Sequence, residues 1–156
     1  MLDEQRKLVL EILDKAMDIT VATNRPDGWP QATTVSFVSD GLNLYFGTWT
    51  GSQKAANIAR DGRVSVTADA PYRAWEEIKS LSMAARAEFV TDPTELARVG
   101  DLMTKRFGSE LAKITSIDMS QTRIIRLRPE IISILDYSKG FGHTAQIAIV
   151  EGRQAA

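Results

Sequence analysis

The stretch GWPQATTVSFVSDGLNLYFGTWTGSQKAAN, residues 28–57, holds the pattern from which the rest of the fold follows. Its segments Pro30–Val38 and Leu42–Thr48 are rich in β-branched and aromatic residues, which is typical of strands. An Asp-Gly pair separates them, and glycine accepts the positive φ that a tight turn requires. Gln53–Arg60 has the alanine-rich pattern of a short, closely packed helix with Ser52 as its N-cap. The stretch therefore predicts two antiparallel strands followed by a helix.

The rest of the chain adds more strands than helices. Further strands are predicted at Asp18–Asn24, Arg63–Ala68, Lys79–Val90, Thr122–Leu127, Ile131–Leu135 and Ile147–Val150. An amphipathic helix is predicted over Asp3–Met17 because Val9, Ile12, Leu13 and Ala16 share one helical face. A third helix starts at Asp92-Pro93 and is expected to end near Phe107, before Gly108.

The segments between these elements complete the prediction of the fold. Arg128-Pro129 is expected to separate two strands, Ser109–Ser120 has no clear pattern, Ser138–Thr144 is a glycine-punctuated loop, and the tail 151–156 is expected to be loose. Two Asp-Gly turns among the first three strands indicate an antiparallel meander. No regular βαβ alternation is visible. We therefore predict one domain over residues 1–156, mainly β, an antiparallel β-barrel with helices.

Composition excludes several classes of function. The chain has 156 residues, no cysteine, a single histidine and a net charge of -1. Thiolate chemistry and histidine-rich metal sites are excluded, and we predict no metal site. No basic surface for nucleic acid and no membrane-spanning run is visible, so we expect a cytoplasmic protein. With so few catalytic side chains, an organic cofactor would most naturally supply any difficult chemistry.

A phosphate group could bind where the short helix begins. A helix N-terminus carries unpaired N–H groups and a partial positive charge. Thr48, Thr50 and Ser52 add hydroxyl donors, Gly51 permits close approach, and Lys54 adds a full positive charge. The spacing matches no standard phosphate-binding motif, so Ser52 as an ordinary N-cap and Lys54 as a solvated lysine remain open alternatives.

The motifs DGWPQATTVSFV, LYFGT, TGSQKAANI and GRVSVTA, in this order, resemble the flavin-binding split-barrel family related to pyridoxamine 5'-phosphate oxidase. The similarity extends from about Asp18 to Val90, and IIRLRPEIISILDYSKGFGHT is similar to the closing segment of many members. The chain is more similar to general stress protein-like members than to the oxidase itself. The resemblance implies an antiparallel split β-barrel of the FMN-binding type and a homodimer with cofactor sites between its subunits.

The resemblance also implies which residues bind FMN. The isoalloxazine ring would lie against the second strand, largely through its backbone, and the phosphate would lie at the start of the short helix. The implied cofactor-binding residues are Thr33, Thr34, Val35 and Ser36 for the ring, Gly47 and Thr48 beside it, Ser52, Gln53 and Lys54 for the phosphate, and Ser80 near the flavin.

The chain departs from the oxidase at several of these positions. Thr33, Val38 and Gln53 stand where the oxidase carries basic residues, and its C-terminal arginine and histidine have no counterparts here. We therefore expect a substrate other than pyridoxamine phosphate. Arg60, Arg63 or an arginine of the TRIIRLR strand could supply the missing positive charge, and the sequence does not choose among them. Relatives of this fold also bind F420 or haem, which remain alternatives to FMN.

These observations lead to competing hypotheses about function. The first is an FMN-dependent oxidoreductase that receives hydride from a reduced nicotinamide or a small organic donor. The second is a flavin-binding module without efficient turnover, and the third is haem binding or degradation. His143 is a possible haem ligand or proton donor, although a structural role is the alternative. Trp49 is placed best of the three tryptophans to stack on a ring, while Trp29 and Trp75 suit packing at a core edge or a dimer surface.

Overall fold

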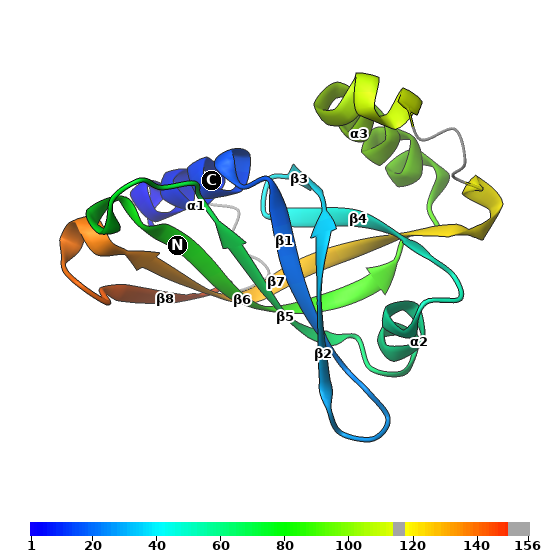
Figure 1. Ribbon diagram of the computed structural model, residues 1–156, viewed down its shortest axis with the longest axis horizontal. Coiled ribbons are helices and arrows are strands. Elements are labelled where there is room, and N and C mark those ends of the chain that lie inside the picture. Colours follow the sequence, from blue (N-terminus) through cyan, green and yellow to red (C-terminus); the bar gives the residue numbers. More distant parts are fainter. Residues whose placement is uncertain (114–117, 150–156) are drawn as a thin grey trace.

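The computed structural model describes residues 1–113 and 118–149, which form one curled antiparallel sheet with three α-helices (Figure 1). In chain order the elements are α1 (Asp3–Lys15), β1 (Asp18–Asn24), β2 (Pro30–Ser36), β3 (Val38–Asp40), β4 (Asn43–Trp49), α2 (Gln53–Arg60), β5 (Arg63–Asp69), the 3₁₀ turn η1 (Trp75–Glu77), β6 (Lys79–Phe89), α3 (Pro93–Lys113), η2 (Met119–Gln121), β7 (Thr122–Asp136), η3 (Tyr137–Lys139) and β8 (Thr144–Ala148). The sheet curls into a half-barrel, which confirms the predicted fold class.

The sheet order is β2-β1-β5-β6-β7-β4-β3, with β8 also paired to β7. The predicted meander is wrong, because β2 and β4 lie near opposite ends of this order. The chain crosses between them at Phe37, whose side chain is fully buried. The predicted strand Pro30–Val38 is therefore two short strands, β2 paired with β1 and β3 paired with β4. A straight strand would keep more ladder hydrogen bonds at this point. The free energy gained by burying the Phe37 ring offsets their loss.

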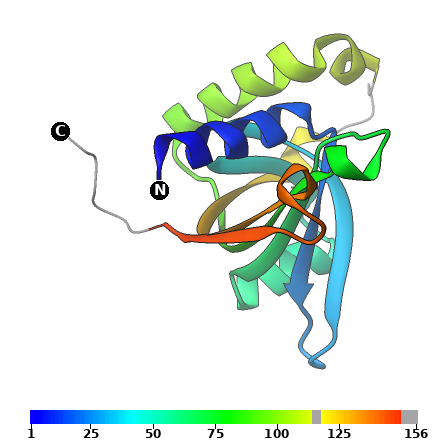
Figure 2. The same ribbon diagram turned by 90° about the vertical axis from the view of Figure 1, so that its left-hand side faces the viewer.

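The core lies between the concave face of the sheet and α1. Strand β5 shows the predicted alternation, since Val64, Val66 and Ala68 are buried while their neighbours are exposed. Helix α1 buries the predicted face over this sheet. Helices α1 and α3 lie on the same side of the molecule and α2 lies on the other (Figures 1 and 2). Arg106 of α3 donates to the Ala16 carbonyl at the end of α1, 2.5 Å away.

The prediction that Gly108 ends the third helix is wrong, because α3 continues to Lys113. Gly108 does not adopt a positive φ, unlike Gly28 and Gly41 in the hairpin turns. Residues after Gly108 include good helix formers, and Lys113 pairs with Glu110 at 2.5 Å one turn away. The helix therefore continues through Gly108 and does not end there.

The two strands predicted around Arg128-Pro129 are one continuous strand, β7. Ala84 pairs with Ile131 while Ala85 pairs with Pro129, so Glu130 is the extra residue of a β-bulge. A proline is tolerated beside a bulge because one ladder donor is already missing there. Strand β8 begins earlier than predicted, at Thr144, and Val150 and the tail lie outside the described residues.

Candidate functional site

The start of α2 brings two hydroxyl groups and an N-terminal helix turn together. Ser52 Oγ accepts a hydrogen bond from the Ala55 N–H at 3.1 Å, which confirms Ser52 as the N-cap. Thr48 Oγ1 at the end of β4 lies 3.0 Å from Ser52 Oγ. Only one of the two hydroxyl hydrogens can occupy that contact, so the other remains able to donate outward. This turn therefore offers hydroxyl and backbone donors to an acceptor.

Lys54 places a positive charge beside these hydroxyls. Its side chain is half-buried, and Nζ lies 5.2 Å from the centre of the Phe46 ring. Burial lowers the pKa of Lys54 from its ordinary value, and in the described part of the chain no carboxylate forms an ion pair with it. A partly desolvated ammonium without a counter-charge favours an anion as its neighbour. We name Thr48, Ser52 and Lys54 the anion seat.

A buried amide network ties the anion seat to the edge strand β2. Asn57 is fully buried, and its Nδ2 donates to Thr23 Oγ1 at 2.9 Å and to Gln31 Oε1 at 3.3 Å. Its Oδ1 accepts from Gln53 Nε2 at 2.8 Å. Sequence analysis missed Asn57, although a polar residue on the apolar face of an alanine-rich helix was the available signal. The network fixes α2 against β1 and β2 together.

The predicted ring-binding strand β2 presents its residues to two faces. Thr33 and Val35 are half-buried, whereas Thr34 and Ser36 are exposed and face Thr20 and Asp18 on the opposite surface. The hydroxyl oxygen Thr33 Oγ1 is buried and has no hydrogen-bond partner among the described residues. An orphaned buried hydroxyl costs roughly 1–3 kcal/mol, and a ligand that bonds it would recover that loss.

The structure brings together the predicted cofactor residues of β4 and α2, but Thr34 and Ser36 on β2 and Ser80 on β6 do not join them. Gly47, Thr48, Ser52, Gln53 and Lys54 cluster where β4 meets α2, and Asn57 links this cluster to β2. Ser80 lies on β6, and β1 and β5 separate that strand from β2 in the sheet. Within one chain, therefore, Ser80 does not join the cluster.

The indole of Trp49 folds back over the turn before α2. A Cβ atom built on Gly51 would lie 2.6 Å from two carbons of the Trp49 ring. Gly51 is therefore the residue that lets the indole pack there, although 62% of Trp49 remains exposed. Of the three tryptophans, Trp49 directly follows Thr48 of the anion seat, as predicted.

His143 and the remaining exposed aromatic residues lie elsewhere. His143 is exposed, and its backbone closes a turn with Gly140 at 3.1 Å. The Phe141 ring lies 6.1 Å from that of Trp75, centre to centre, and both are largely exposed. Figure 1 shows this orange loop at the opposite end of the molecule from α2. In a single chain, His143 cannot contact a ligand in the anion seat.

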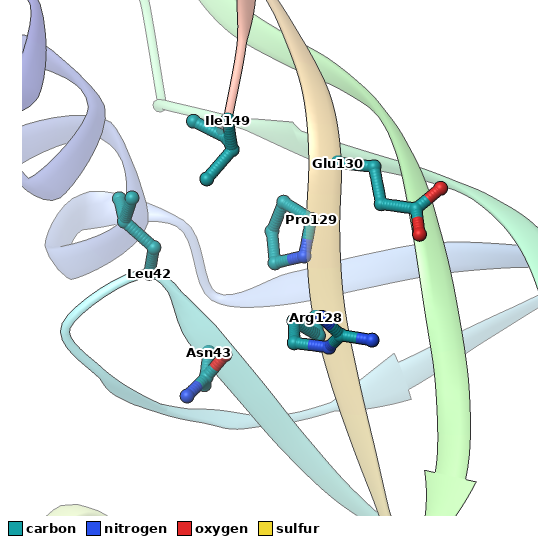
Figure 3. Close-up of a pocket in the computed structure, with 6 residues that line it drawn as sticks. All are labelled: Leu42, Asn43, Arg128, Pro129, Glu130 and Ile149. Atoms are coloured by element: carbon teal, nitrogen blue, oxygen red, sulfur yellow. The ribbon is translucent and has the colours of Figure 1, made fainter. Parts of the chain in front are cut away.

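Open pockets also lie away from the predicted residues. A pocket of about 490 Å³ opens where β4 and β8 diverge along β7 (Figure 3). It is lined by Leu42, Asn43, Arg128, Pro129, Glu130 and Ile149. Two further pockets of about 380 and 350 Å³ lie beside α1. Within the described ranges, none of the three is lined by a predicted cofactor residue. The predicted cofactor residues therefore lie outside these three pockets.

Two other classes of site find no support in residues 1–113 and 118–149. No group of three or more histidine, cysteine or acidic residues there could hold a metal ion. In the same ranges, no helix is long and apolar enough to cross a membrane.

Comparison with solved structures shows the same fold in proteins of low sequence identity. A haem-binding protein from Mycobacterium smegmatis is 19% identical with a TM-score of 0.79, over 95% of this chain and 59% of that one. The haem storage protein HutZ from Vibrio cholerae is 21% identical with a TM-score of 0.65, over 83% and 90%. A conserved hypothetical protein from Mycobacterium tuberculosis is 24% identical with a TM-score of 0.74, over 100% and 95%. This chain thus spans little more than half of the first of these proteins.

Comparison at the level of sequence gives a family. No curated protein matches the chain closely enough to be counted as a relative. The model of the pyridoxamine 5'-phosphate oxidase family, in contrast, matches residues 6–136, which include β2, the anion seat and all of β7. The chain belongs to the pyridoxamine 5'-phosphate oxidase family.

Proposed function

We propose that the protein binds FMN, with the phosphate in the anion seat and the ring along β2, and acts as an FMN-dependent oxidoreductase. The observation that carries the proposal is the half-buried Lys54 ammonium, which lacks a carboxylate partner in the described chain, beside the Thr48 and Ser52 hydroxyls. The orphaned Thr33 hydroxyl on β2 supports the placement of the ring. Membership of the family supports FMN over an unrelated phosphate ligand.

The chain's own residues would bind and orient the cofactor. As an edge strand, β2 has backbone N–H and C=O groups on its free side that can bond a flat polar ring. The Asn57 network keeps this strand at a fixed position relative to the anion seat. Bound FMN would supply the hydride chemistry, with a reduced nicotinamide or a small organic molecule as the donor. A flavin-binding module without turnover uses the same contacts.

A second copy of the chain would pack against the sheet that carries this site. One surface of the sheet presents two rows of uncharged residues across six strands, and most of these residues are small. They are Thr34, Thr20, Thr67, Ser82, Ser133 and Gln146, and next to them Ala32, Ala22, Ser65, Ala84, Ile131 and Ala148. Small side chains allow two such surfaces to approach each other closely. We infer a homodimer through this face.

Introducing a charge tests the dimer. We expect Ser82→Glu to produce monomers, because a two-fold interface would bring two copies of the new carboxylate into it. The same substitution at exposed Ser109 on α3 is the matched control and should leave the assembly unchanged. Sedimentation equilibrium measures both. A wild-type monomer, or a dimeric Ser82→Glu variant, would exclude this interface.

The absorption spectrum of the purified protein tests the cofactor. We expect flavin bands, or their appearance with saturable binding after FMN is added, and bleaching on reduction with dithionite. Rapid-mixing with NADH and NADPH then separates an oxidoreductase from a binding module, because a module's flavin stays oxidised. A colourless protein that does not bind added FMN would overturn the proposal.

Haem binding is the second candidate function. Two proteins with this fold are a haem-binding protein and a haem storage protein, and His143 is an exposed imidazole in this chain. The same spectrum distinguishes the two, since haem gives a Soret band, and F420 gives neither a Soret band nor the FMN spectrum. If haem binds through His143, His143→Ala shifts the Soret band; an unchanged band would exclude that ligation.

A further inference from the structure

Lys54 alone supplies one positive charge to the anion seat, and the structure identifies a second. Four other arginines that could contribute are engaged or point elsewhere. Arg60 donates to the Asn24 carbonyl at the far end of α2, Arg63 pairs with Asp61, Arg126 pairs with Glu88 and Glu95, and Arg128 lines the pocket in Figure 3. The remaining arginine of the same strand is Arg123.

The register of the sheet places Arg123 beside the anion seat. Arg123 of β7 is the direct partner of Thr48 in β4. Side chains of directly opposed residues project from the same face, with Cβ atoms about 4.5–5.5 Å apart. The next pair on that face joins Phe46 to Ile125, and Lys54 lies over the Phe46 ring. Arg123 and Lys54 therefore lie on the same face of the sheet as Thr48.

The local structure holds the start of β7 in this position, and among the described residues the Arg123 guanidinium has no partner. The Thr50 N–H donates to the Gln121 carbonyl at 2.8 Å, and Thr50 Oγ1 lies 3.3 Å from Gln121 Oε1. Two residues later, the Arg123 side chain is exposed. Across the described ranges, no hydrogen bond or ion pair joins it to another residue.

We propose that Arg123 is a binding residue of the anion seat and that, together with Lys54, it makes the seat selective for a phosphate monoester. A phosphate monoester carries a charge of about −1.5 to −2 at neutral pH, and two cations match it better than one. An arginine can also donate two parallel hydrogen bonds to phosphate oxygens. The inference rests on the proposed function, whose phosphate it places between Thr48, Ser52, Lys54 and Arg123.

The test compares FMN with riboflavin, which has the same ring and no phosphate. Dissociation constants for both are measured by fluorescence quenching with wild type, Arg123→Gln and Arg63→Gln. The Arg63→Gln control removes one positive charge from an exposed position at the other end of α2. We expect Arg123→Gln to weaken FMN binding about tenfold or more, the effect of one charge-assisted hydrogen bond, and to leave riboflavin binding unchanged. Arg63→Gln should change neither.

Each outcome has a distinct meaning. A wild-type preference for FMN that survives Arg123→Gln overturns the role of Arg123 and leaves the proposed function standing. Equal wild-type affinity for FMN and riboflavin overturns the anion seat as a phosphate site. A wild type that binds neither flavin overturns the proposed function and this inference with it.

Discussion

Lys54→Met should remove most of the preference for a phosphorylated ligand without destabilising the protein. A charge-assisted hydrogen bond contributes about 1.5–3 kcal/mol, so we expect FMN affinity to fall roughly 10- to 100-fold. The ligand-free protein should keep its stability or gain up to about 1 kcal/mol, since methionine needs no solvation and still covers the Phe46 ring. Urea unfolding and FMN titration of the same preparation measure the two effects.

The dependence of stability on pH gives a second signature of Lys54. Because burial lowers its pKa, the folded chain binds this proton less tightly than the unfolded chain does. Stability therefore rises with pH between the lowered folded value and the ordinary value of 10.5, and Lys54→Met should abolish this contribution. Lys105→Met, which changes an exposed lysine on α3, is the control that should alter neither FMN affinity nor the stability of the ligand-free protein. A strongly destabilised Lys54→Met variant would contradict the assignment of Lys54 to ligand binding.

Features encoded by neighbouring residues could be predicted from the sequence. The alternation of Val64, Val66 and Ala68 predicts β5, and the hydroxyl of Ser52 predicts the N-cap of α2. Both predictions are confirmed, because strand periodicity and helix capping depend on residues close in the chain. Gly108 predicts too early an end for α3, because a long helix with good helix formers tolerates one glycine.

Features that depend on distant pairing could not be predicted. The crossing at Phe37 separates β2 from β4, and it depends on burial of a ring by elements far along the chain. The choice of Arg123 among five arginines required the register between β4 and β7. The cofactor residues on β2 and at the start of α2 were proposed from resemblance, and it is the Asn57 network that physically connects these two parts.

Asn57→Ala should have the largest effect on stability of any change at the site. The substitution leaves the Thr23 hydroxyl and the Gln31 and Gln53 amides without a shared partner in a fully buried position. Each unsatisfied buried group costs about 1–3 kcal/mol, and part of that cost is relieved where a side chain can turn toward water. We expect the free energy of unfolding to fall by about 2–4 kcal/mol, measured as a lower urea midpoint at unchanged slope.

Gln53→Ala is the comparison for Asn57→Ala, because it removes a single contact of the network from the same helix. Gln53→Ala removes one of the three contacts from an exposed residue and should cost less than about 1 kcal/mol. If the network positions β2 relative to the anion seat, folded Asn57→Ala protein should also lose affinity for riboflavin, whose binding does not depend on the phosphate contacts. If Asn57→Ala is as stable as Gln53→Ala, water replaces the Asn57 amide in the network. Unchanged riboflavin binding would show that β2 holds its position without Asn57, because the β1 ladder alone would then suffice to fix the strand.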